Sequence, residues 1–156
     1  MASAEATRLP PGLLDVRRPF SPVQWAAFLG ALAVLVWSVP GLIANPDFAV
    51  GEEASSVRVL GVDMNGWHAV AGFLVAIPAL LAARRPNLAA IVCLAAGTGL
   101  VATAVWALLD TQLAGGLLYF PNNEADARLH VGTASIFLAG AAHYFLVERS
   151  VTARAR

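Results

Sequence analysis

Residues 88–109 read LAAIVCLAAGTGLVATAVWALL, an uncharged apolar run of 22 residues. A helix of about 20 such residues crosses the roughly 30 Å hydrocarbon core of a bilayer. Three more uncharged apolar stretches of similar length cover residues 23–43, 67–83 and 129–147. We therefore predict an all-α fold, an integral membrane four-helix bundle whose transmembrane domain comprises residues 23–147.

Composition agrees with a membrane environment. The chain has 156 residues, of which 58% are hydrophobic and 13% charged, and its mean hydropathy is +0.68. Soluble domains carry nearly twice that share of charge. The formal net charge is zero, and the basic residues are all arginines without a long basic tract, so nucleic-acid binding is disfavoured. The single cysteine, Cys93, has no partner for an intrachain disulfide.

The arginines predict how the bundle is oriented. Eight of the ten lie before the first predicted span, in the turn between the second and third, or after the fourth, and these are Arg8, Arg17, Arg18, Arg84, Arg85, Arg149, Arg154 and Arg156. Cytoplasmic connections of membrane proteins carry an excess of basic residues. We therefore predict a multi-pass plasma-membrane protein with both termini in the cytoplasm. Residues 1–22 then form a disordered cytoplasmic tail and residues 148–156 a second one, whereas residues 45–66 and 110–128 face outward.

Small residues recur at helical spacing and predict helix packing. They are Ala95, Gly99 and Thr103 in the third stretch, and Gly132 and Ala139 in the fourth. Small side chains let neighbouring helix backbones approach closely in a membrane. Packing within the four-helix bundle accounts for this pattern more simply than a seam between two copies of the chain.

Two histidines, His68 and His130, open the second and fourth stretches from the outer side. Each follows residues suited to capping a helix, and these capping candidates are Asp63, Asn65 and Asp126. The simplest interpretation is that the histidines belong to the caps and connect loop to bundle. The similar openings also suggest two repeated helical hairpins, each with one span going out and one coming back.

A metal site is the alternative for these histidines. His68 and His130 could converge with Asp63, Glu124 or Asp126, because imidazole and carboxylate ligands together suit zinc, copper or iron. A haem held between the two imidazoles is a further alternative. The spacing matches no standard metal motif, so the sequence alone predicts no cofactor. Imidazole nitrogens more than about 8 Å apart could not share one ion whose bonds are about 2 Å long.

Two short motifs carry a family resemblance, and they consist of Asn65, Gly66, Trp67, His68 and Gly72 in the second stretch and of Asp126, Leu129, His130 and Gly132 in the fourth. Over residues 28–147 the sequence resembles a family of small four-helix bacterial membrane proteins of uncharacterised function, known mainly from actinobacteria. The resemblance implies fold and topology without an activity. The chain departs from an exact repeat at Ala134, four residues after His130, where Gly72 has its counterpart in the second stretch.

No catalytic residues are predicted. The sequence contains no P-loop, dinucleotide fingerprint, nucleophile elbow or HExxH motif, and no charged residue within the four stretches. We therefore expect a non-enzymatic structural or accessory subunit of the cell envelope. Its partners would be the lipid bilayer and another membrane protein or a second copy of the chain. The alternatives are a metal or haem binder using His68 and His130, and a small-solute carrier.

Overall fold

The computed structural model describes residues 20–50, 53–109 and 123–150. The elements are α1 (Pro22–Ala44), β1 (Val57–Val59), β2 (Val62–Met64), α2 (Gly66–Ala82), α3 (Pro86–Leu109), α4 (Glu124–His143) and a π-helical continuation, η3 (Tyr144–Glu148). The prediction of an all-α helical bundle is confirmed. The predicted tails fall mostly on residues 1–19 and 151–156, which lie outside the described residues.

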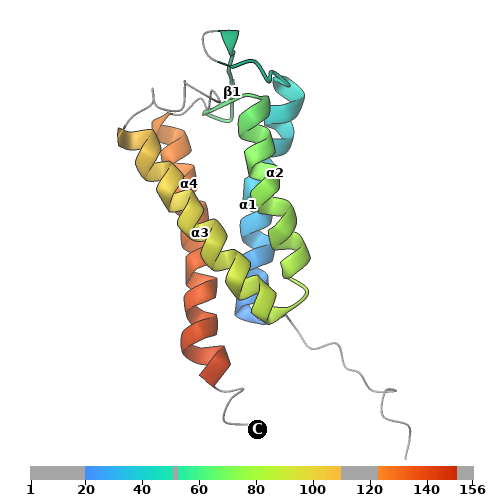
Figure 1. Ribbon diagram of the computed structural model, residues 1–156, viewed down its shortest axis with the longest axis vertical. Helices are drawn as coiled ribbons and strands as arrows, with labels where there is room; N and C mark the ends of the chain where they lie inside the picture. Colours follow the sequence, from blue (N-terminus) through green and yellow to red (C-terminus); the bar gives the residue numbers. More distant parts are fainter. Residues whose placement is uncertain (1–19, 51–52, 110–122, 151–156) are drawn as a thin grey trace, which may run out of the picture.

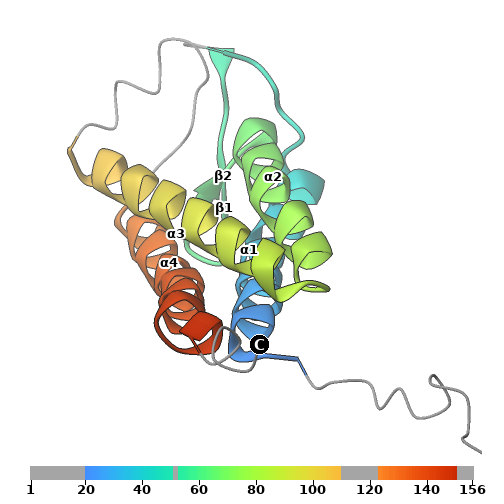
Figure 2. The same ribbon diagram turned by 60° about the horizontal axis from the view of Figure 1, so that its bottom comes forward.

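The four helices form two pairs. α1 packs on α2, α3 packs on α4, and contacts between α1 and α4 join the pairs. Figures 1 and 2 both show this arrangement, with α3 inclined across the bundle so that it diverges from α2 beyond their short turn. The first turns of α2 and α4 lie at the same end of the molecule (Figure 1), which we call the outer end. The opposite end, at the turn around Arg84 and Arg85, is called the arginine end.

Three helical segments are long and apolar enough to cross a bilayer, as judged by length and composition. They are Pro22–Ala44, Pro86–Leu108 and Glu124–Glu148, whereas the apolar helix α2 is shorter at 17 residues. These helices suggest a membrane protein. α4 begins at Glu124, five residues before the apolar stretch that starts at residue 129, because Asn123 caps the helix and charged residues fill its first turns.

Small residues close the arginine end of the bundle. Its buried core contains Val23, Ala27, Ala79, Ala83, Ala89, Ala90, Phe137 and Ala141, all at most 2% exposed. A Cβ atom added at Gly30 would lie 2.6 Å from the Phe137 ring, and one added at Gly140 would collide with the Ala26 methyl group. Glycine is therefore required where α4 crosses α1.

The predicted packing residues lie on exposed faces of α3 and α4. Ala95, Gly99, Thr103, Gly132 and Ala139 are all exposed, and added Cβ atoms at Gly99 and Gly132 would meet nothing within 4 Å. The close contact between α3 and α4 instead involves Gly97, where an added Cβ would lie 2.6 Å from Leu138 Cγ. Beyond the charged first turns of α4, both helices carry apolar residues around their circumference, so the spacing of small residues could not distinguish the packed face from the exposed one.

A small β-hairpin precedes α2, in a connection for which the sequence predicted no regular structure. β1 and β2 pair antiparallel, with Arg58 opposite Asp63, and the turn between them has positive φ at Leu60 (51°) and Gly61 (90°). Positive φ at both turn residues matches the twist of a two-residue hairpin. Alternating VRV and VDM around Leu-Gly is the signal that could have predicted it.

The connection between α1 and α2 is tied to the start of α2. Asp47 accepts hydrogen bonds from Ser55, and its carbonyl accepts one from the Gly66 amide at 2.8 Å. The indole of Trp67 donates to the Phe48 carbonyl at 2.9 Å. These bonds fix the position of the first turn of α2.

Candidate metal-binding site

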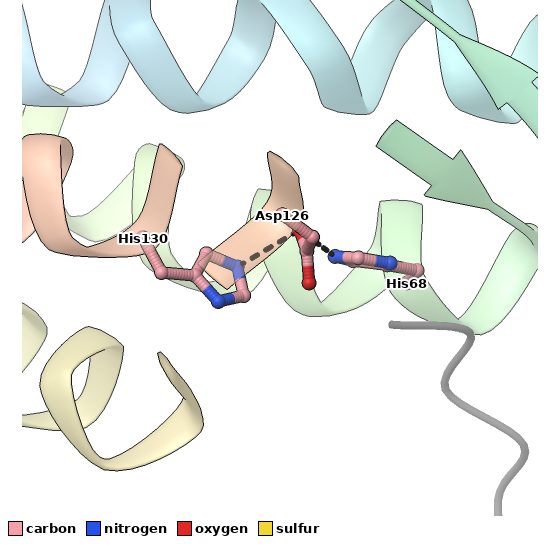
Figure 3. A group of neighbouring side chains, drawn as sticks. All are labelled: His68, Asp126 and His130. Carbon is pink, nitrogen blue, oxygen red and sulfur yellow. Dashed lines mark ion pairs between the residues drawn. The ribbon is translucent and has the colours of Figure 1, made fainter. Parts of the chain in front are cut away.

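Three side chains converge at the outer end: His68 from α2, and Asp126 and His130 from α4 (Figure 3). The ligand atoms that they offer all lie within 4.8 Å of one another. Asp126 Oδ1 lies 3.5 Å from His68 Nε2 and 3.6 Å from His130 Nε2. The centroids of the two imidazole rings are 5.9 Å apart. The imidazole nitrogens are therefore closer than about 8 Å, the separation above which they could not share one ion.

The cap of α2 positions His68. Asn65 is the N-cap residue, and its side-chain oxygen accepts a hydrogen bond from the His68 amide at 2.9 Å. His68 Nδ1 lies 3.2 Å from the main-chain carbonyl of Asp63 on β2. Because a carbonyl can only accept, Nδ1 carries a proton, so that in the neutral form of the ring the Nε2 lone pair lies on the side of Asp126.

The cap of α4 is Asn123, not the predicted Asp126. The Asn123 side chain accepts a hydrogen bond from the Asp126 amide at 2.9 Å and donates to the Gly61 carbonyl at 3.1 Å. Asp126 was a reasonable cap candidate by residue type, but it lies three residues inside the helix, where its side chain turns into the bundle. His68 and Asp126 thus occupy equivalent positions, each three residues after a capping asparagine.

His130 follows Asp126 by one helical turn, so both side chains lie on the same helix face. Its Nδ1 is 3.3 Å from the hydroxyl of Thr103 on α3. That hydroxyl donates to the Leu100 carbonyl at 3.0 Å and so accepts from the imidazole. His130, like His68, is held as the tautomer that directs Nε2 at Asp126.

The Asp126 carboxylate is fully buried between the imidazoles. Neither of its oxygens accepts a hydrogen bond from any residue that the structure describes. Its separations from the imidazole nitrogens exceed the 2.7–2.9 Å typical of a charge-assisted hydrogen bond. With both imidazoles neutral, three electron-pair donors face one another, and a shared cation would compensate the buried charge.

The other predicted ligands are engaged elsewhere. The Asp63 carboxylate pairs with Arg58 at 2.9 Å, and this hydrogen bond lowers the pKa of Asp63 below its usual value of 3.8. Glu124 is exposed and pairs with Arg128 one turn further along α4. Asp63 contacts the site through its main-chain carbonyl, which lies against His68 Nδ1. Sequence reasoning missed Thr103 as a contact of His130, and no pattern in α3 marks it.

A cavity of about 310 Å³ adjoins the three side chains. Its lining comes from all four helices and the hairpin, and besides the site residues it includes Val34, Trp37, Met64, Gly72, Val75, Ala96, Leu100, Trp106 and Leu129. Ala95, Gly99 and Thr103 line the cavity although they are exposed, so it opens to the surface along α3. The three small residues of α3 that were predicted to pack thus leave space beside the site.

Fold and site together define a class: an all-α bundle of apolar helices, of the kind that suggests a membrane protein, with a buried His-Asp-His cluster at one end. The chain belongs to the family described as Domain of unknown function (DUF4383), whose model matches residues 24–143. The family match agrees with the resemblance to an uncharacterised family. No curated protein and no solved structure matches the chain.

Proposed function

We propose that this protein is a multi-pass membrane protein that binds a divalent transition-metal ion through His68, Asp126 and His130. One observation carries the proposal: three potential ligand atoms lie within 4.8 Å of one another around a fully buried carboxylate. The Asn-to-His and Asp-to-His motifs would then be the functional signature of the chain.

The distances suit an ion of the zinc class. Ligand bonds of about 2.0–2.1 Å in tetrahedral geometry set ligand atoms about 3.3 Å apart. The two separations from Asp126 Oδ1 are 3.5 and 3.6 Å and need only a small contraction, and all three ligand atoms lie within 4.8 Å of one another. Two imidazoles and one carboxylate leave at least one coordination position for an external ligand, as in catalytic zinc and non-haem iron sites.

Hydrogen bonds to the imidazoles strengthen this interpretation. Metal-bound histidines almost always donate their second N–H to a carbonyl, carboxylate or water, which fixes the ring and raises its basicity. The Asp63 carbonyl serves His68 in this way and Thr103 serves His130. These contacts are also compatible with simple capping, but capping does not account for a buried carboxylate without hydrogen bonds from described residues.

Haem and solute transport fit less well. A haem between the histidines would need its porphyrin plane to pass where the Asp126 carboxylate lies (Figure 3). A carrier needs a polar path through the bundle, whereas the arginine end is closed by buried alanines, glycines and Phe137. An accessory role in a larger envelope complex remains compatible with a metal site, and the ion would then stabilise the outer end of the subunit.

For topology we propose four spans in the plasma membrane with both termini in the cytoplasm. The support is the arginine distribution, together with the start of α1 and the end of the α4 and η3 helix, which lie at the same end of the bundle (Figure 1). The metal site then lies near the outer membrane surface. Cysteine labelling of Ser56→Cys and Ser150→Cys variants in intact cells tests this orientation, with label expected only at the first position.

The metal proposal is tested on the full chain purified in detergent with an affinity tag free of histidine. Zn²⁺ titration followed by elemental analysis should give one ion per chain, and Co²⁺ should give visible d–d bands. Asp126→Asn and His130→Ala should each weaken binding by about 100-fold, because each removes one of the three protein ligands. Circular dichroism and gel filtration verify that these variants remain folded.

Matched controls separate a specific site from general histidine or carboxylate binding. Asp63→Asn removes a carboxylate that is not one of the three proposed ligands and keeps the main-chain carbonyl beside His68, and His143→Ala removes a histidine that pairs with Glu148 at the other end of α4. Both should bind metal as the unmodified chain does. Equal affinity in the Asp126→Asn variant and the unmodified chain, or no stoichiometric uptake by the unmodified chain, would overturn the proposal.

A further inference from the structure

The cavity beside the His-Asp-His cluster combines an apolar body with one polar end. It extends along α3 from Ala95 to Trp106, a helical rise of about 16 Å at 1.5 Å per residue. Polar side chains gather where His68, Asp126 and His130 enter it. Its volume of about 310 Å³ is twice that of a cavity that holds benzene, and lies within the range of small-molecule sites.

We propose that this cavity binds a medium-chain monocarboxylate, a fatty-acid-like molecule whose carboxylate reaches the metal ion and whose chain lies along α3. This inference rests on the proposed metal site. Liquid water occupies about 30 Å³ per oxygen atom, so the cavity has room for about ten non-hydrogen atoms. A chain of about ten carbons therefore matches both the length and the volume of the cavity.

Charge complementarity selects an acid over a neutral amphiphile. A divalent ion with one carboxylate and two neutral imidazoles carries a net charge of +1. A monoanionic oxygen ligand in the open coordination position would neutralise a site that is largely shielded from water, since the His68 and His130 side chains are 12% and 15% exposed.

Trp37 supplies a second, independent indication. Its indole N–H is shielded from solvent and has no acceptor among the described residues, although Trp37 lines the cavity. Buried indole N–H groups usually find a hydrogen-bond partner. A ligand that brings an oxygen acceptor into the cavity would satisfy it.

Gly99 and Gly132 provide a matched pair of variants. An added Cβ at either position would meet nothing within 4 Å, so neither glycine is packed against a neighbouring group at its Cβ position. Gly99 lines the cavity, whereas Gly132 is exposed on α4 and is not part of the lining. Gly99→Leu should therefore fill the cavity and leave the metal ligands intact, and Gly132→Leu should affect neither.

The experiment follows the d–d spectrum of the Co²⁺-loaded full chain during titration with decanoate, acetate and decanol. Decanoate should shift the spectrum at a concentration at least about tenfold below that required for acetate, because the alkyl chain adds apolar contacts. Decanol should leave the spectrum unchanged. In Gly99→Leu the Co²⁺ spectrum should persist while decanoate loses its advantage over acetate, and in Gly132→Leu the advantage should remain.

The outcomes distinguish this inference from the metal proposal. If the chain takes up no Co²⁺, the proposed function itself fails. If Co²⁺ binds but decanoate acts no better than acetate, or acts equally in Gly99→Leu, only the fatty-acid inference fails. A decanol effect equal to that of decanoate would likewise overturn it, because the carboxylate would then not be the group at the metal.

Discussion

The two ends of the bundle are built on opposite principles. At the arginine end, alanines, glycines and Phe137 fill the space between helices, and an added methyl group at Gly140 would collide with Ala26. At the outer end, the first turns of α2 and α4 meet across a cavity and a polar cluster, held by asparagine caps and a β-hairpin. One end provides rigidity through packing, and the other keeps space for chemistry.

The largest expected effect comes from Gly140→Ala at the packed end. The new methyl group would overlap the Ala26 side chain and force α4 away from α1, at a cost of about 2–3 kcal/mol. The matched variant Gly132→Ala, two turns earlier on α4, meets open space and should stabilise the helix by about 0.5–1 kcal/mol. Thermal unfolding in detergent measures both, and equal effects would contradict the packing described for α4.

Next in size is Gln24→Ala, which removes a buried polar link at the arginine end. Gln24 donates to the Ala83 carbonyl at 2.7 Å and accepts from the Ser21 amide at 3.0 Å, so its loss should cost about 1–2 kcal/mol. The exposed pair of Arg58 and Asp63 at the outer end is the comparison. Arg58→Ala should cost at most about 0.5 kcal/mol in the same unfolding assay.

Asn65→Ala at the outer end should have a smaller effect on stability and a distinct effect on the site. Loss of the N-cap costs about 1 kcal/mol, and it releases the backbone that orients His68. Metal affinity should therefore fall while the helix content stays unchanged. Asn65→Asp retains a capping oxygen and should keep the stability and the metal affinity close to those of the unmodified chain. Unchanged Zn²⁺ affinity in Asn65→Ala would show that the cap does not position the histidine.

The smallest expected effect is a pH response in the connection between α1 and α2. Hydrogen bonds from the Ser55 hydroxyl and from the Ala49 and Ser55 amides lower the pKa of Asp47 below its usual value of 3.8. Because the folded pKa is the lower one, this contribution to stability is present above pH 3.8 and is lost as the pH falls below it. Amide hydrogen exchange at Ala49 and Ser55, corrected for intrinsic rates, should then rise, and in Asp47→Asn it should already be raised at neutral pH.

The sequence predicted the helices well because each is apolar over nearly its whole length. That same property concealed how they pack: Ala95 and Gly99 could not be distinguished from Gly97 as the contact residue of α3. The site was only partly predictable. His68, Asp126 and His130 were among the candidates by residue type and by their place at helix starts, but their convergence depends on how α2 and α4 are placed in the bundle, which no local pattern encodes. The caps were harder to assign, since Asn123 and Asp126 are both suitable by residue type.

The shortness of α2 has a consequence for access to the metal site. Its 17 residues cover about 26 Å, against about 30 Å for a typical hydrocarbon core. If α2 spans the membrane as proposed, this hydrophobic mismatch would draw the bilayer inward around its ends. Such local thinning would bring the aqueous boundary down to the level of His68, so that an ion could load from the extracellular side without crossing lipid. The same mismatch would favour the thinner regions of the membrane as the protein's location.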